Sequence, residues 1–506
     1  MIRVGRYGME RRAPEPGNSG SMQSGWSGQF ALMAGSFIGT YHTVSLNVSI
    51  PAFADIFEAD PASLQWLVTC FMLAAGMVAP ISGYLGARFG YKRIFAVCMA
   101  GLTLTSVCCG LAWNLGSLIV FRTVQGVFSG LIQPVAMALL YRIVPRPKQP
   151  LAVSVWSAAS ITASAVAPSA SGWLQGVHWP MMFWVTVIPS VAAMFLGLRY
   201  LPEAASNQRL KPDGRGMMLA AAASAAYLVV FGNLHAWGLG SPAAIIGLIT
   251  GTLAVILFII HELRTPEPML QLRLFASRTF TASVAVSVVL IAGLYAGTYF
   301  LPLYFQHIQS LTSFEVGLLF LPGACAVTAA TIAAGKLNSR RSEFALIVSG
   351  AVLLLVSTWA FTKFETDTGT AYAVFWMCMR NVGIGLSLTP LLNVGMQAVA
   401  KEMSGHASAL LHWVRQVFGG IGVGCFASYF YQRLETRSRS MHGPGSTGAG
   451  SEGGAVDPVI YMAGLQDAFW LIFLFLAAAM PVLLMLRNKP KHEPCASRGE
   501  NVHIRS

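Results

Sequence analysis

Long uncharged runs divide this chain, and short polar or basic stretches separate them. Two of the runs, 64–82 and 94–113, each have about 20 residues, the length that an α-helix needs to cross the hydrocarbon core of a bilayer. Along the whole chain the pattern predicts fourteen such helices, centred near residues 40, 74, 103, 128, 163, 190, 225, 252, 290, 326, 354, 381, 418 and 477. The sequence therefore favours an all-α polytopic membrane protein.

Composition and charge agree with this pattern. Of the 506 residues, 55% are hydrophobic and only 10% are charged, against about 25% charged in a soluble globular protein. The net charge of +13 would suggest a nucleic-acid partner in a soluble protein, but its distribution argues otherwise. Of the 33 Lys and Arg residues, 26 lie in the two tails and every second loop, 4 in the alternate loops and 3 within spans. The positive-inside rule then predicts a multi-pass protein of the plasma (inner) membrane with both termini in the cytoplasm.

The second part of the chain repeats features of the first. A basic stretch at 335–341 follows the tenth span much as 83–93 follows the second, and the segment that begins at Arg380 resembles the one that begins at Arg122. The economical interpretation is two six-helix halves with two inserted helices between them. Parallel repeats of this kind place a substrate site between the halves, near the middle of the membrane.

This interpretation sets the expected boundaries. Both ends of the chain are polar and basic, and a Gly- and Ser-rich stretch precedes the last span. The expected parts are a cytoplasmic tail (1–27), an N-terminal half (28–201), a linker with two inserted helices (202–279), a C-terminal half (280–486) that includes a flexible external loop (431–467), and a second cytoplasmic tail (487–506).

Three arginines within the spans are the first functional candidates: Arg122, Arg380 and Arg415. A charged side chain inside the membrane is costly unless it is paired or faces a wet cavity, so it indicates function by default. The alternative for Arg122 is a structural arginine that binds backbone carbonyls of the first helix. None of the 20 Asp and Glu residues lies well inside a span, so no carboxylate accompanies these charges.

Other polar and aromatic side chains within the spans are candidates for coupling or for a substrate pocket. His42 and Gln125 join the arginines as coupling candidates, although a packed, neutral His42 is the competing interpretation. The pocket candidates are Asn47, Gln133, Tyr295, Tyr299, His412 and Trp413.

Three short motifs together resemble a known family. A loop signature between helices two and three is matched by Gly83, Leu85, Arg88, Gly90, Lys92 and Arg93. A signature in helix four is matched by Arg122, Gln125 and Gly126. A signature in helix one is matched by Asn47, Val48, Ile50 and Pro51. With fourteen expected spans, the chain resembles the major facilitator superfamily and, more narrowly, its 14-helix drug:proton antiporters of the EmrB/QacA type.

The resemblance implies roles for matched residues. It implies a gating turn with Gly83, Arg88, Gly90, Lys92 and Arg93, and a helix-five hinge with Pro168 and Gly172. The chain departs from the family at Ala87, where the loop signature has an acid, at Ala167 and Ser171, where the hinge has glycines, and at His42, where helix one commonly has Asp. The usual membrane carboxylate is therefore missing, which predicts a preference for neutral, zwitterionic or anionic compounds over permanent cations.

These observations predict an ion-coupled efflux transporter of small amphipathic drugs or natural products that works by alternating access with proton antiport. The expected partners are a small-molecule substrate, protons and the bilayer, with a periplasmic adaptor if the source has an outer membrane; no cofactor or metal is expected. Transport of an anionic metabolite is the main alternative, and a membrane sensor on a transporter fold is a further one. No HExxH, GxSxG or Walker-type motif supports an enzyme.

Overall fold

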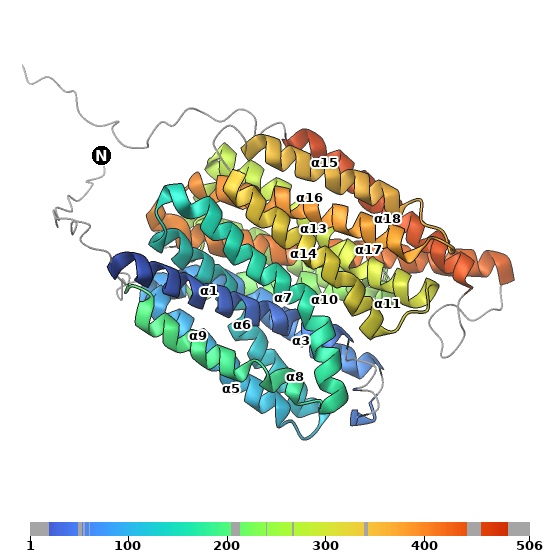
Figure 1. The fold of residues 1–506 in the computed structure, drawn as a ribbon, viewed down its shortest axis with the longest axis horizontal. Helices are drawn as coiled ribbons and strands as arrows, with labels where there is room; N and C mark the ends of the chain where they lie inside the picture. The colour runs from blue at the N-terminus through green and yellow to red at the C-terminus, as the bar shows by residue number, and fades with distance from the viewer. Residues whose placement is uncertain are drawn as a thin grey trace, which may run out of the picture.

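The computed structural model describes residues 20–48, 53, 56–59, 61–203, 213–238, 240–265, 268–337, 343–442 and 457–483. Within these ranges the chain forms helices joined by short connections, without a β-strand. Two groups of helices, together with an inserted pair, make up the fold (Figure 1).

The helices α1 to α9 form the N-terminal half. Most of them are long and rich in uncharged residues, as expected for membrane-crossing helices. Their bounds are α1 Gly20–Val44, η1 Ser45–Val48, α3 Pro61–Val78, η2 Ala79–Ile81, α4 Ser82–Phe89, α5 Tyr91–Gly110, α6 Leu115–Ile143, η3 Arg146–Lys148, α7 Gln149–Val177, α8 Met181–Trp184 and α9 Val187–Tyr200.

The inserted pair and the C-terminal half follow. The inserted helices are α10 Gly214–Gly232 and α12 Pro242–Arg264, with the short α11 Leu234–Trp237 between them. The C-terminal half contains η4 Leu272–Ala276, α13 Arg278–Leu303, the π-turn η5 Tyr304–Ile308, α14 Ser313–Leu337, α15 Glu343–Phe361, α16 Thr370–Gln397, η6 Lys401–Met403, α17 Ser404–His442 and α18 Pro458–Leu483.

Ten helices of the described residues are long and apolar enough to cross a membrane. The other long helices, α1, α7, α16 and α17, have 25 to 39 residues but do not reach the same hydropathy, so the number fourteen stays a prediction. Two expected boundaries are wrong. Helix α1 begins at Gly20, inside the tail expected at 1–27, and α17 continues to His442, inside the loop expected at 431–467.

Glycines allow close helix packing inside each half. A Cβ atom on Gly126 or Gly130 of α6 would collide with the α3 backbone at Phe71 or Ala75. In the C-terminal half, Gly383 of α16 approaches the α15 backbone in the same way. Small residues at such crossings let dispersion contacts form between backbones where lipid gives no hydrophobic driving force.

The basic turn expected at 83–93 is largely helical. Helix α4 ends at Phe89 and α5 begins at Tyr91, so the chain reverses at Gly90 alone. Gly90 has φ 89°, a conformation that other residues adopt only with strain. The loop expected between helices two and three is therefore reduced to Gly90.

The two halves meet along α7 and α14, which lie side by side in Figure 1. Helix α10 of the inserted pair packs against both α3 and α17, one helix from each half. Leu228 and Phe231 of α10 fill the space beside Gly76 of α3 and beside Gly420 and Gly424 of α17. The inserted pair therefore closes one side of the joint between the halves.

Candidate functional site

Arg122 is the centre of a buried polar network in the N-terminal half. Its side chain, 1% exposed, donates hydrogen bonds to the backbone carbonyl of His42 (3.0 Å) and to Gln125 Oε1 (2.7 Å), and it stacks over the ring of Phe71 at 4.1 Å. His42 lies among the last four residues of α1, whose carbonyls leave the regular helical ladder. Arg122 therefore supports the end of α1, as the structural interpretation expected.

His42 belongs to the same network. Its Nε2 lies 3.2 Å from Ser106 Oγ of α5 and 3.0 Å from Thr186 Oγ1, and Gln125 Nε2 donates to Ser106 Oγ at 3.0 Å. The His42 side chain has no exposed surface. The network thus joins α1, α5, α6 and the α8–α9 connection inside one half, away from the joint with the other half.

Arg380 takes the equivalent position in the C-terminal half with simpler contacts. Its guanidinium donates to the backbone carbonyls of Gly293 (3.1 Å) and Leu294 (2.6 Å) on α13. It crosses α13 at Gly297, where any Cβ atom would collide with the guanidinium. Arg380 is 2% exposed, so, like Arg122, it fastens two helices of its own half.

Polar side chains of three N-terminal helices meet near the joint. Trp156 of α7 donates from Nε1 to Ser36 Oγ of α1 at 2.6 Å. Gln133 of α6 donates from Nε2 to the Ser36 carbonyl (3.0 Å) and to Thr40 Oγ1 (2.8 Å). Gln133 and Thr40 remain partly exposed.

His412 of α17 faces this group from the C-terminal half. Its ring lies edge-on to Trp156 with the ring centroids 6.4 Å apart. Its Nε2 atom is buried without a hydrogen-bond partner among the described residues. Arg415, one turn further along α17, lies close enough to His412 and to the Tyr295 hydroxyl for electrostatic interaction. In the described part of the chain Arg415 forms no hydrogen bond or ion pair, and it is partly exposed.

The remaining pocket candidates lie in different places. Tyr299 approaches Tyr431 through their hydroxyls (3.4 Å), and Tyr295 packs against Gly419 of α17. Trp413 points the other way: its Nε1 donates to Ser224 Oγ of α10 at 2.7 Å and its ring meets Phe258 of α12. Trp413 therefore anchors the inserted pair. The Asn47 side chain lies outside the described residues.

Hydrogen bonds join the halves at one end of the molecule, where α6 and α16 end and α17 begins, and another joins Thr162 of α7 to Thr328 of α14 at 3.0 Å. Tyr141 donates to Asn393 Oδ1 at 2.7 Å, and Ser408 donates to the Pro134 carbonyl at 3.0 Å. The positive-inside rule assigns this end to the cytoplasm. The described conformation is thus closed at the end expected to be cytoplasmic.

Tyr91 is the centre of this closure. Its hydroxyl donates to the Gly83 carbonyl at 3.2 Å, and Arg142 lies over its ring at 4.3 Å. Gly405 of α17 passes so close that any Cβ atom there would overlap the Tyr91 hydroxyl. Arg142 also donates to Ser404 at 3.4 Å. Gly83, Tyr91 and Arg142 therefore add further contacts between the halves at this closure.

The basic residues of the expected gating turn lie at the edge of the closure around Tyr91. Arg88 donates to the Tyr84 hydroxyl within α4 and lies over the Phe89 ring. Lys92 is partly exposed and Arg93 is exposed at the start of α5. In the described residues these two have no hydrogen bond to the C-terminal half. The gating role of this turn stays a prediction; of its residues, Gly83 lies against Gly405 of α17 in the described structure.

The expected hinge lies inside one continuous helix. Pro168 and Gly172 are both within α7, which runs from Gln149 to Val177. The side chain of Pro168 lies outside the described residues. Ser171, which replaces a family glycine, donates to the carbonyls of Ala167 and Ser45, each at 2.7 Å. This hydroxyl ties α7 to the turn after α1.

Several contact residues were missed from the sequence. Trp156, Tyr91, Tyr141, Ser36 and Asn393 carry the contacts between helices described above. Trp156 gave a usable signal, because it is one of only two large aromatics, with Trp173, in a span crowded with Ala and Ser. The others resemble ordinary span residues, and only the packing of distant helices identifies them.

Comparisons with known proteins agree with this geometry. Residues 26–423 match the family model described as Major Facilitator Superfamily. The tetracenomycin C resistance and export protein of Streptomyces glaucescens is 28% identical over 413 residues, which cover 81% of this chain and 76% of that protein. The fatty acid resistance protein FarB of Neisseria gonorrhoeae is 26% identical over 403 residues, covering 78% and 79%.

A solved structure supports the fold. The proton:xylose symporter XylE bound to a bromodeoxyglucose has a TM-score of 0.61 at 13% sequence identity, covering 91% of this chain and 97% of that one. At this identity the likeness concerns the fold alone. With a family match that spans most of its length, the chain belongs to the major facilitator superfamily.

Proposed function

We propose that the protein is an efflux transporter that exports small amphipathic compounds by alternating access, in exchange for protons. The observation that carries this proposal is the closure at the end expected to be cytoplasmic. There Tyr141 and Ser408 donate hydrogen bonds across the joint and Tyr91 packs against Gly405, within a buried cluster that includes residues of both halves. Alternating access requires these contacts between the halves to separate, whereas the networks around Arg122 and Arg380 each lie within one half and can stay intact.

The names of the relatives favour export over uptake. Proteins that confer resistance to an antibiotic or to fatty acids are among the similar sequences. Their identity to this chain, 28% and 26%, supports a similar substrate class without naming a compound.

The charges near the joint favour neutral or anionic substrates. Arg122 and Arg380 are held by backbone carbonyls, so only Arg415 of the three intramembrane arginines is free to meet a substrate. The carboxylate of Asp467 in α18 is occupied by Arg437 at 2.7 Å. A cation entering beside Arg415 would find no carboxylate to offset the repulsion. An amphipathic weak acid would gain from the same charge.

We assign proton coupling to His412. Unlike the fully buried His42, its side chain is partly exposed and lies at the joint, where its ring meets Trp156 of the other half; its Nε2 atom is buried and lacks a partner in the described structure. Arg415 on the same helix is a charged group beside it. Protonation of the His412 ring would add a second positive charge beside Arg415. That charge would change how the site binds an anion.

Transport of an anionic metabolite is the second candidate, and Arg415 favours it as well. The two candidates differ in how apolar the transported compound is. The test is a transport assay in proteoliposomes with an imposed pH gradient, using an amphipathic weak acid and a small hydrophilic anion of equal charge. Gradient-dependent transport of the amphipathic acid alone supports drug-type efflux, while transport of the hydrophilic anion alone contradicts it.

A further inference from the structure

The inserted helix pair has a groove that combines basic and apolar side chains at one end. It has a volume of about 460 Å³ and lies between the start of α10 and the end of α12. Arg215, His261 and Arg264 give it polar groups, and Met218, Leu257 and Ile260 give it apolar walls.

The two arginines in this groove are unpaired in the described part of the chain. Both are exposed, and neither forms a hydrogen bond or an ion pair with a described residue. They come from two different helices and converge on one groove. Two such cations leave a concentrated positive charge that a dianionic or monoanionic oxygen group would neutralise.

The nearby carboxylates face inward. Asp213, with a side chain only 7% exposed, accepts hydrogen bonds from His261 Nε2 at 2.7 Å and from the Gly216 amide at 2.9 Å. Glu262, 2% exposed, accepts from the Leu270 amide at 3.2 Å. Negative charge is therefore turned toward the protein, and the guanidinium groups are turned outward.

The groove continues into a surface that faces lipid. Met218 is 68% exposed, and Leu257 and Ile260 are 44% and 43% exposed. In a membrane-spanning helix pair these side chains contact acyl chains. The arginines lie at the end of the pair that the positive-inside rule assigns to the cytoplasm, the depth at which phospholipid headgroups lie.

We propose that this groove is a binding site for an anionic phospholipid. The phosphate lies between Arg215 and Arg264, and the acyl chains run along Met218, Leu257 and Ile260. Basic pockets between transmembrane helices at this depth are suited to anionic headgroups, each basic residue contributing to the attraction. Because α10 packs against both α3 and α17, a lipid bound here would contact the helix pair that spans the joint between the halves.

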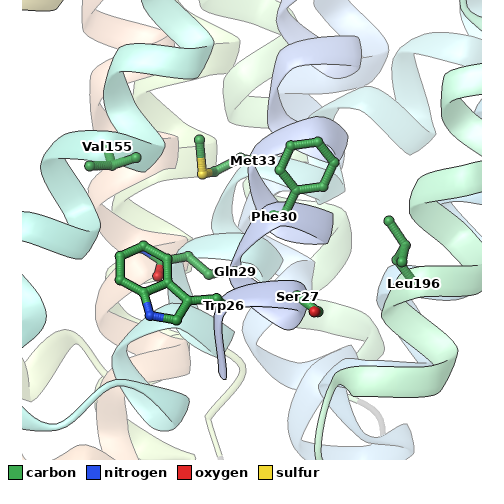
Figure 2. A pocket seen from close by; sticks show the side chains of 7 residues that line it. All are labelled: Trp26, Ser27, Gln29, Phe30, Met33, Val155 and Leu196. Carbon is green, nitrogen blue, oxygen red and sulfur yellow. The ribbon is translucent and has the colours of Figure 1, made fainter. Parts of the chain in front are cut away.

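A second groove provides the contrast. Its volume is about 450 Å³, and it is formed by α1 with Val155 of α7 on one side and Leu196 of α9 on the other (Figure 2). Trp26, Phe30 and Met33 of α1 line it, and it contains no basic side chain. This groove offers apolar contact without charge, so it has no preference for an anionic headgroup.

The test uses native mass spectrometry to measure how the purified full chain binds phosphatidylglycerol or phosphatidylcholine as each lipid is titrated. The variant R215Q/R264Q removes both charges. The matched control R199Q/R273Q removes two exposed arginines that also lie at the end expected to be cytoplasmic but outside the groove, in α9 and η4. A charge-keeping variant, R215K/R264K, tests whether positive charge alone is sufficient, and gel filtration establishes that each variant is folded.

We expect R215Q/R264Q to bind phosphatidylglycerol about tenfold more weakly, with the control changed less than twofold. We expect R215K/R264K to keep most of the affinity. Glycerol phosphate without acyl chains should not compete at equal concentration. Equal binding of phosphatidylcholine, unchanged binding by R215Q/R264Q, or equal loss in the control would each overturn the proposal, and so would full competition by glycerol phosphate.

Discussion

The two halves hold their buried arginines in different ways. Arg122 lies in a closed network that includes Gln125, Ser106 and the backbone of His42 at the end of α1. Arg380 binds two carbonyls in the middle of α13, which already accept hydrogen bonds within that helix. The N-terminal half thus uses the polar groups around its buried arginine internally, while the C-terminal half has His412 and the partly exposed Arg415 at the joint. The difference suggests a fixed N-terminal half and a C-terminal half that meets substrate and protons.

The largest effect is expected at Arg122. The R122Q variant should lower the thermal midpoint and reduce transport below a tenth, because two buried oxygen acceptors, each worth about 1 to 3 kcal/mol, lose their donor. R380Q should cost less, since the carbonyls of Gly293 and Leu294 keep their helical partners. Thermal unfolding of the two purified variants measures this directly. Equal destabilisation would contradict the distinction between the halves.

The next effect is expected at the closure between the halves. The G405A variant places a methyl group where the Tyr91 hydroxyl lies, so the cytoplasmic end should no longer close and transport should fall at least tenfold. Y91F should restore part of the activity of G405A by removing the hydroxyl. Gly232, which has no atom within 4 Å of its Cβ position, provides the control as G232A. Wild-type transport by G405A would show that this contact is not required for turnover.

A smaller effect is expected from the two histidines, and it concerns pH dependence. H412Q should weaken the dependence of transport on an imposed pH gradient, because it removes the ring that we propose takes up the proton at the joint. H42Q should lower stability through the loss of its contacts with Ser106 and Thr186 but keep the pH profile. A pH profile of transport that changes in H42Q and not in H412Q would assign proton coupling to the N-terminal half instead.

Much of the fold could be predicted from the sequence, because the bilayer imposes strong local rules. Uncharged runs and the placement of Lys and Arg indicated most helices, and the inserted pair lies close to where it was expected. The start of α1 at Gly20 and the extension of α17 to His442 could not be predicted from hydropathy, since polar residues can continue a helix beyond its apolar run.

The site was harder to predict. A buried arginine is easy to find, but the sequence cannot say whether it faces substrate or a carbonyl of another helix. Arg122 and Arg380 share this ambiguity, and only distances of 3.0 and 2.6 Å to backbone oxygens resolve it. Both His412 and Trp413 were expected in a pocket. Adjacent helical residues point about 100° apart, so His412 faces Trp156 at the joint while Trp413 faces Ser224 of α10.

The most direct test of the C-terminal half as the substrate-facing half is charge selectivity at Arg415. Competitive transport in proteoliposomes compares an amphipathic weak acid with a permanent cation of similar size, in the wild-type protein and in R415Q. We predict that the wild-type protein transports the acid faster than the cation. R415Q should reduce the ratio of the acid rate to the cation rate by about tenfold, because an interaction of about 1.4 kcal/mol between the Arg415 charge and the substrate charge corresponds to a tenfold change. A wild-type preference for the cation, or a ratio unchanged by R415Q, would contradict the assignment of Arg415 to the substrate site.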